Sequence, residues 1–262
     1  VQEQLAEAQQ QIDELLPMLT SLDARARKAI LKERKGQPER DIDRPQPLAN
    51  WNFNNDLRDS LGALHGTAHG TARIDNGALV LDGQGAFVST PALGKPLREK
   101  TLEAWVLLDN LDQRGGGVMS VQTLDGSVFD AIVFGERETK HWMAGSDFFR
   151  RYKSFQGPPE TEAANKPVHI AVTYESDGTI TAYRNGQKYG TAYRSSFVSF
   201  EAGKSQIVFG LRHAPTGGNR MLAGKILEAN LYDHALDAEA IAASSGVQHD
   251  FVSEKAIIAW LT

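Results

Sequence analysis

The carboxylate residues of this chain could act in acid–base catalysis if their spacing allows it. A glycosidase needs two carboxyl groups close together, and on one face of a strand they stand two positions apart. Glu136 and Glu138 have that spacing, but they belong to a polar turn, so we expect both to be solvated. Glu103 is the sole acid of its segment, and Asp125 and Asp130 lie at hairpin ends, where aspartate is a common turn residue. We therefore predict no catalytic residue.

Other reactive groups are equally sparse. The chain contains no cysteine, which excludes disulfides, thiolate zinc sites, a cysteine nucleophile and covalently attached haem within these residues. His65 and His69 are four positions apart, but their Gly-containing segment is not of helical type, so none of the 7 histidines forms the i, i+4 pair of a helical zinc site. We expect His169 to have a structural role because it lies in a segment of strand type.

Aromatic and basic residues are concentrated between positions 141 and 159. Sugar binding needs aromatic faces for stacking and planar polar groups for hydroxyls. The predicted ligand-binding residues, including two from a second segment that could face this one, are Trp142, Phe149, Arg150, Tyr152, Arg212 and His213. The alternative is that about half of the aromatic residues belong to the core. Arginine and tyrosine without acids would also suit an anionic glycan or a peptide.

Composition excludes several classes of protein. The 262 residues carry 28 basic and 33 acidic side chains, a net charge of −5, whereas a protein that binds nucleic acid normally has a basic excess. No apolar run approaches the length of a membrane span. A hydrophobic fraction of 41% and 24 glycines indicate a globular chain with many turns.

The first part of the chain differs from the rest. Residues 1–35 lack glycine and aromatic residues and carry apolar residues at alternating spacings of three and four, which predicts a helical extension of coiled-coil type. Pro17 should kink or break this helix. Such a helix could self-associate, pack on its own domain or act as a spacer. Residues 36–47 contain three prolines and are predicted to be a linker.

From residue 48 the pattern changes to short strands separated by turns. The clearest unit is a meander over 168–190, in which Asn185–Gly186 is a favoured type I′ turn. The end of the chain turns helical again: residues 237–262 are predicted to hold two short helices, the first capped by Asp237 and stopped by Gly246. The predicted strands cover 79–81, 101–108, 117–121, 128–134, 168–174, 179–184, 207–211 and 226–232. Strands this short and numerous predict an all-β sandwich over 48–236.

Several motifs together resemble a known family. The segments LANWNFNNDLRDSLGALHGTA, GALVLDGQGAFVST, TLEAWVLL, VHIAVTYESDGTITAYRNGQKYG and LAGKILEANLYDHALDAEAIAA resemble, in order, the motifs of laminin-G-like domains. This family has the concanavalin A-like lectin/glucanase fold, a jelly-roll sandwich of antiparallel strands. The piece 115–147 after a Gln-rich helix also resembles the insert of planctomycete-type multi-domain cytochrome proteins, which implies a periplasmic or extracellular bacterial protein.

The resemblance also implies a calcium site. Many relatives hold calcium where the first-strand loop meets the closing strand, and the matching positions are Asp59 and Glu228. The sequence departs from the family in two places: Asn54 stands where relatives often have an acid, and Leu227 replaces the acid before Glu228. Fewer charges predict weaker affinity.

Three hypotheses about function follow. The favoured one is a non-catalytic binding module, for carbohydrate, within a larger extracytoplasmic protein. The second is a structural domain that docks neighbouring cytochrome-type domains of the same polypeptide. The third and least favoured is a glycoside hydrolase.

Overall fold

The computed structural model describes residues 44–246, together with Leu15, Pro17, Met18, Ser21, Leu22, Arg25, Ala26 and Ala29. The helix predicted over 253–262 lies outside the described residues, and so do most of the helical extension and of the linker. These parts of the organisation remain predictions. In the described part of the chain, no helix is long and apolar enough to cross a membrane.

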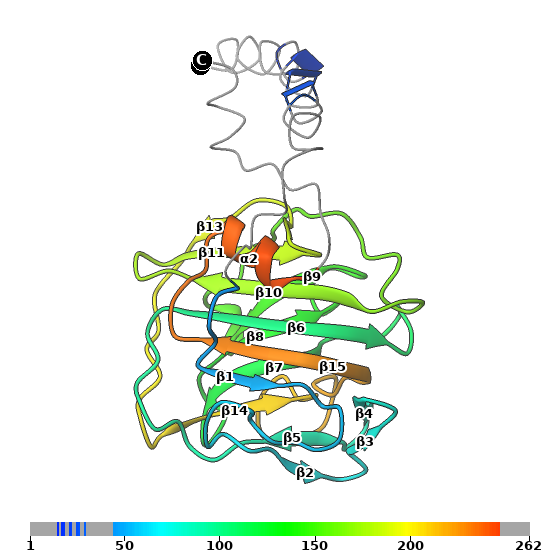
Figure 1. Ribbon diagram of the computed structural model, residues 1–262, viewed down its shortest axis with the longest axis vertical. Coiled ribbons are helices and arrows are strands. Elements are labelled where there is room, and N and C mark those ends of the chain that lie inside the picture. Colours follow the sequence, from blue (N-terminus) through cyan, green and yellow to red (C-terminus); the bar gives the residue numbers. More distant parts are fainter. Residues whose placement is uncertain are drawn as a thin grey trace. The chain divides into compact units, whose positions relative to one another are not determined.

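Residues 44–246 form two antiparallel sheets, so the predicted β-sandwich is confirmed (Figure 1). The first sheet has the order β12-β11-β10-β6-β15-β4-β3, with β1 beside β15 and β13 beside β11; the second has the order β2-β5-β14-β7-β8-β9. The strands of the first sheet are β1 (Ala49–Trp51), β3 (Arg73–Asp75), β4 (Ala78–Asp82), β6 (Lys100–Leu108), β10 (Val168–Tyr174), β11 (Thr179–Arg184), β12 (Gln187–Lys188), β13 (Tyr193–Arg194) and β15 (Ala223–Tyr232). Those of the second sheet are β2 (Thr67–His69), β5 (Phe87–Ser89), β7 (Gly116–Thr123), β8 (Phe129–Phe134), β9 (Trp142–Ser146) and β14 (Ser205–Phe209).

Each of the eight strand segments expected from the sequence corresponds to a strand. The meander is present as β10, β11 and β12, and both Asn185 and Gly186 have the positive φ of their turn. The sequence patterns did not predict β9, whose five residues are all buried and therefore show no alternation of polar and apolar side chains. β9 leads directly into residues 147–153.

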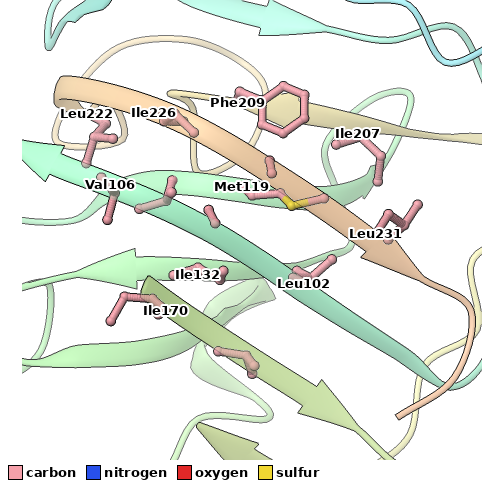
Figure 2. Packing of buried hydrophobic residues seen from close by; sticks show 14 of the residues in the cluster. Leu102, Val106, Met119, Ile132, Ile170, Ile207, Phe209, Leu222, Ile226 and Leu231 are labelled. Carbon is pink, nitrogen blue, oxygen red and sulfur yellow. The ribbon is translucent and has the colours of Figure 1, made fainter. Parts of the chain in front are cut away.

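Side chains that point between the sheets form the main core. In β10, Val168, Ile170 and Val172 face inward, as the alternation predicts. Figure 2 shows this layer, with Leu102 and Val106 of β6 lying near residues of the opposite sheet. Other labelled members are Met119, Ile132, Ile170, Ile207, Phe209, Leu222, Ile226 and Leu231.

One helix, α2 (Ala238–Ser244), covers the outer face of the first sheet at β10 and β11 (Figure 1). The Asp237 carboxylate accepts a hydrogen bond from the Ala240 N–H, which confirms the predicted cap. Ile241 packs on Tyr232 and Ala171 of the sheet. Gly246 follows the helix with a φ of +61°, a conformation that glycine tolerates best, and so ends it as expected.

Candidate functional site

Residues 147–153 form a loop after β9 that presents two phenylalanines to solvent; we call it the aromatic loop. Its first three residues make a single 3₁₀ turn, Asp147–Phe149. Phe148 is 83% exposed and Phe149 is 37% exposed, although large apolar side chains are usually buried. Their φ angles are +46° and +56°, in the left-handed region that is costly for residues with bulky side chains. Strain and exposure at the same two positions are typical of a functional loop.

Arg151 holds this loop in place from below. It is only 5% exposed, and its guanidinium donates hydrogen bonds to the Asp130 carboxylate at 2.9 Å and the Asp147 carboxylate at 2.8 Å, and to the Phe129 carbonyl at 2.7 Å. Lys100 completes the group with an ion pair to Asp130 at 2.8 Å. Two cations and two carboxylates therefore balance in a buried cluster, which we call the loop anchor. Breaking such a buried pair strands an uncompensated charge, so the anchor fixes the loop strongly.

This cluster changes the interpretation of Asp130. The sequence predicts Asp130 to be a turn residue at a hairpin end, but Asp130 is 1% exposed and bound to both Lys100 and Arg151. Asp125 does have the expected turn role: it accepts hydrogen bonds from Thr123 and Ser127, and these lower its pKa to about 2.

Arginine side chains lie against both exposed rings. The Arg150 guanidinium is 5.4 Å from the centre of the Phe148 ring, and that of Arg137 is 4.8 Å from the centre of the Phe149 ring. Both distances are within the range of cation–π contacts. Among the described residues, the carboxylate within ion-pair distance of Arg150 is that of Asp147, at 3.7 Å, and it is already bound by Arg151. The tip of the loop therefore combines aromatic surface with accessible guanidinium groups.

Tyr152 forms the side of the aromatic loop. Its ring packs against the apolar residues that β8 and β9 place on the outer face of the second sheet, and its hydroxyl donates a hydrogen bond to the Glu138 carboxylate at 2.5 Å. Burial and this hydrogen bond raise the pKa of the tyrosine, which therefore stays neutral. The same hydrogen bond lowers the pKa of Glu138, which therefore keeps its negative charge.

Trp142 is not part of this surface. The structure buries it in the core of the sandwich, where its ring packs against Phe134 at 4.8 Å between ring centres. Its indole N–H donates to the Glu160 carboxylate at 2.8 Å. Glu160 is also bound by Arg184, and although burial opposes ionisation, these hydrogen bonds lower the pKa of Glu160 to about 2. The alternative that some aromatic residues of 141–159 belong to the core therefore applies to Trp142.

Arg212 and His213 lie on a segment that crosses the outer face of β7. The Leu211 carbonyl accepts a hydrogen bond from Ser120, and a side chain on Gly117 would collide with the Arg212 backbone, so the segment lies directly on the strand. Arg212 is 7% exposed and pairs with Glu136, and its guanidinium also donates to the Gly115 carbonyl at 3.1 Å. The positive charge of Arg212 is thus compensated by a carboxylate of the protein itself.

His213 is half-buried beside the same face. Its ring stacks on Phe129 with 4.3 Å between ring centres, and its Nε2 accepts a hydrogen bond from Arg220. Burial lowers the pKa of His213, and the backbone carbonyl of Ala214 opposes this only in part. The imidazole is therefore neutral near pH 7 and adds no positive charge to the surface.

The sequence predicts a solvated Glu136, but the structure largely buries this side chain. Its side chain is 10% exposed because it pairs with Arg212, and Glu138 is bound by Tyr152. Burial raises the pKa of Glu136, although Arg212 opposes this effect. The two carboxylates thus have different partners, and each has a structural explanation.

A second polar cluster lies buried under α2, and we call it the sealed cluster: Glu103, His169, Asn230, Tyr232 and Ser244. One oxygen of Glu103 is 2.7 Å from His169 Nε2, and the other accepts hydrogen bonds from Ser244 at 2.8 Å, Asn230 at 2.9 Å and Tyr232 at 3.0 Å. Burial opposes the charge of Glu103, but these partners outweigh it and lower its pKa. His169 has the structural role that the sequence analysis expects.

Asp59 and Glu228 lie on two sides of Asn50. Asp59 accepts hydrogen bonds from the backbone N–H groups of Asn50, Leu61 and Leu64 at 3.1, 3.0 and 3.2 Å. Glu228 accepts one from the Asn50 side-chain amide at 3.0 Å. The contacts of Asp59 are those of a residue that fixes a turn. In the described residues, no three histidine, aspartate or glutamate side chains cluster as metal ligands would.

An open depression of about 420 Å³ lies beside Asp59. Its lining is polar and rich in side-chain oxygens, which are the ligands that calcium prefers. The residues are Asn52, Asn54, Asn55, Asp56, Arg58, Asp59, Ser60 and His65. Next to this lining, the Trp51 indole N–H donates a hydrogen bond to the Leu64 carbonyl at 2.8 Å.

The structure therefore places Phe149, Arg150 and Tyr152 together in the aromatic loop. Trp142 and Arg212 are buried and do not belong to this surface. Sequence reasoning missed Arg137, which comes from the loop between β8 and β9, and did not select Phe148. A usable signal existed for Phe148: two adjacent phenylalanines cannot both point inward from one extended segment.

Comparisons with known proteins agree with this fold. A family model described as the concanavalin A-like lectin/glucanases superfamily matches residues 82–242. No curated protein matches the sequence. Among solved structures, domain 4 of AbnA, an extracellular GH43 arabinanase from Geobacillus stearothermophilus in complex with arabinotriose, is similar with a TM-score of 0.58 and 19% identity, over 76% of this chain and 98% of that one.

Two larger proteins contain a similar part. Trypanosoma rangeli sialidase is similar with a TM-score of 0.55 and 13% identity, over 88% of this chain but 39% of its own length. The binding domain of botulinum neurotoxin serotype D is similar with a TM-score of 0.54 and 16% identity, over 77% of this chain and 52% of its own. At such identities the likeness concerns the fold, whereas the family model covers more than half of the sequence. The chain belongs to the concanavalin A-like lectin/glucanases superfamily.

Proposed function

We propose that this chain is a non-catalytic carbohydrate-binding module of a larger extracytoplasmic bacterial protein, and that the aromatic loop is its contact with sugar. The observation that carries the proposal is the 83% exposure of Phe148 on a strained loop that a buried arginine holds rigid. Aromatic surface is what sugar rings stack on, and a rigid loop loses little entropy on binding.

The relatives support the same function. Domain 4 of the arabinanase was solved with arabinotriose, and the neurotoxin part is a binding domain. Against a hydrolase stands the engagement of the candidate carboxylates: Glu136 with Arg212, Glu138 with Tyr152, and Glu103 within the sealed cluster. An extracellular relative also supports a periplasmic or extracellular location.

A glycan array probed with the full 262-residue chain tests the proposal. We expect binding to at least one class of glycan, and loss of that binding in Phe148→Ala. Leu61→Ala is the matched control, since Leu61 is another large apolar residue, 54% exposed, on a different loop. Silence across the array together with tight binding to neighbouring domains of the parent protein would favour the docking hypothesis instead.

We keep calcium in the proposal at the depression beside Asp59. One oxygen of Asp59 accepts a single hydrogen bond and so has capacity left, and Asp56 adds a second carboxylate to the lining. Glu228 belongs to the other side of Asn50 and is the weaker of the two candidate ligands.

A further inference from the structure

Around the aromatic loop, exposed cationic side chains outnumber exposed carboxylates. Among the described residues beside it, the Asp147 carboxylate is paired with Arg151 at 2.8 Å, and the Glu138 carboxylate accepts a hydrogen bond from the neutral Tyr152 at 2.5 Å. The cations are exposed: Arg137, Arg150 and Lys153 all have exposed side chains. In the described part of the chain, neither Arg137 nor Lys153 has a carboxylate within ion-pair distance.

This local excess of positive charge is opposite in sign to the net charge of the whole protein. The chain carries a net −5, so three exposed cations around one loop do not follow from its composition. Both arginines lie against the rings of consecutive residues, Phe148 and Phe149. Packing on an aromatic face limits the motion of a guanidinium and leaves its N–H edge free to donate.

We infer that the aromatic loop selects sugars that carry a carboxylate, such as uronic or sialic acids; this inference rests on the proposed function. The planar guanidinium matches a carboxylate in a bidentate manner, and the ring beside it offers the apolar surface that the sugar carbons need. A neutral sugar would use the phenylalanines but offer the arginines no carboxylate. An acidic peptide would use the arginines and gain nothing specific from the exposed rings.

The test compares each acid sugar with its own methyl ester, which has the same stereochemistry without the charge. The probes are trigalacturonic acid and 3′-sialyllactose with their esters, and affinities for the full chain are measured by calorimetry. For at least one pair we expect the acid to bind about tenfold or more tightly than its ester, as the loss of charge-assisted hydrogen bonds implies. Its affinity should fall as salt rises.

Variants assign the effect to the loop. Arg137→Gln with Arg150→Gln should remove the preference for the acid while leaving the melting temperature unchanged, since both side chains are exposed. Arg73→Gln on β3 is the control, because it removes an exposed arginine of the other sheet and should change nothing.

Each other outcome contradicts the inference in a distinguishable way. Equal affinity for acid and ester, or an acid preference that survives the double substitution, overturns the charge selection and leaves the proposed module intact if Phe148→Ala still abolishes binding. Equal binding of poly-glutamate or of anionic phospholipid vesicles also overturns it, because charge alone would then suffice. No binding to either pair or to any glycan of the array overturns the proposed function as well.

Discussion

The sealed cluster and the loop anchor both bury charged groups, and they differ in what lies above them. The sealed cluster is covered by α2, and its central Glu103 carboxylate accepts hydrogen bonds from side chains on β15 and α2 and contacts His169 of β10. The loop anchor lies below a loop that puts Phe148 almost fully into solvent. Similar buried chemistry thus attaches a helix in one region and fixes a strained, exposed loop in the other.

This difference separates the residues that we expect to stabilise the fold from those that we propose to bind a ligand. In the sealed cluster nothing faces solvent, so its contribution is to the packing of α2 on the first sheet. In the loop anchor, the buried Arg151 holds the conformation, whereas the exposed Phe148 and Arg150 can meet a ligand. Substitutions below the loop should therefore change stability, and substitutions at its tip should change binding.

The largest effect is expected for Arg151→Met. The substitution removes the closer of the two cations beside Asp147 and one of the two partners of Asp130, which leaves buried negative charge. Removing one side of a buried pair costs about 3–5 kcal/mol in the free energy of unfolding. Urea denaturation measures it, with Arg150→Met as the control, since an exposed substitution changes stability by about 0.5 kcal/mol or less. Equal stability of the two variants would show that the anchor does not hold the loop.

The next effect concerns pH at the sealed cluster. The pKa of Glu103 is lower in the folded than in the unfolded chain, so its contribution to stability is present above its ordinary value of 4.5 and is lost as pH falls below that value. Glu103→Gln should reduce stability near pH 7 by about 1–3 kcal/mol, because an amide presents donors to the donors of Asn230, Tyr232 and Ser244.

The same variant should flatten the pH dependence. Wild type and Glu103→Gln are compared by denaturation at pH 7 and near pH 3, where the difference between them should shrink. Glu160→Gln is a useful comparison, since the pKa of Glu160 also falls, to about 2. A constant difference between wild type and Glu103→Gln across this range would mean that Glu103 is not the group that titrates.

A smaller effect tests the strain at the loop tip. Phe148 has a φ of +46°, which glycine adopts without penalty and residues with a Cβ do not. Phe148→Gly should therefore be more stable than Phe148→Ala by about 1 kcal/mol. The opposite order, as found at ordinary extended or helical positions, would remove the argument that the loop is strained. Both variants should lose glycan binding alike.

The sequence predicted the sandwich well because its strands alternate, as Val168, Ile170 and Val172 show, and because Asn185–Gly186 specifies a turn locally. It predicted the site less well. Trp142 lies in a strand that is buried on both faces, so its pattern does not distinguish core from surface. The partners of Asp130 and Glu103 come from distant parts of the chain, and no local pattern encodes such pairings.

The smallest effect is expected for calcium at the depression beside Asp59. A cation that binds only the folded chain stabilises it by mass action, so millimolar calcium should raise the melting temperature by a few degrees, and chelator should reverse the rise. Asp59→Ala is ambiguous by itself because it also removes the acceptor of three backbone N–H groups. Asp56→Ala is the sharper variant, since Asp56 lines the depression from an exposed position and its loss should cancel the calcium response alone. A melting temperature that ignores calcium and chelator in wild type would leave the depression without a cation, and Asp59 with the purely structural role that its hydrogen bonds describe.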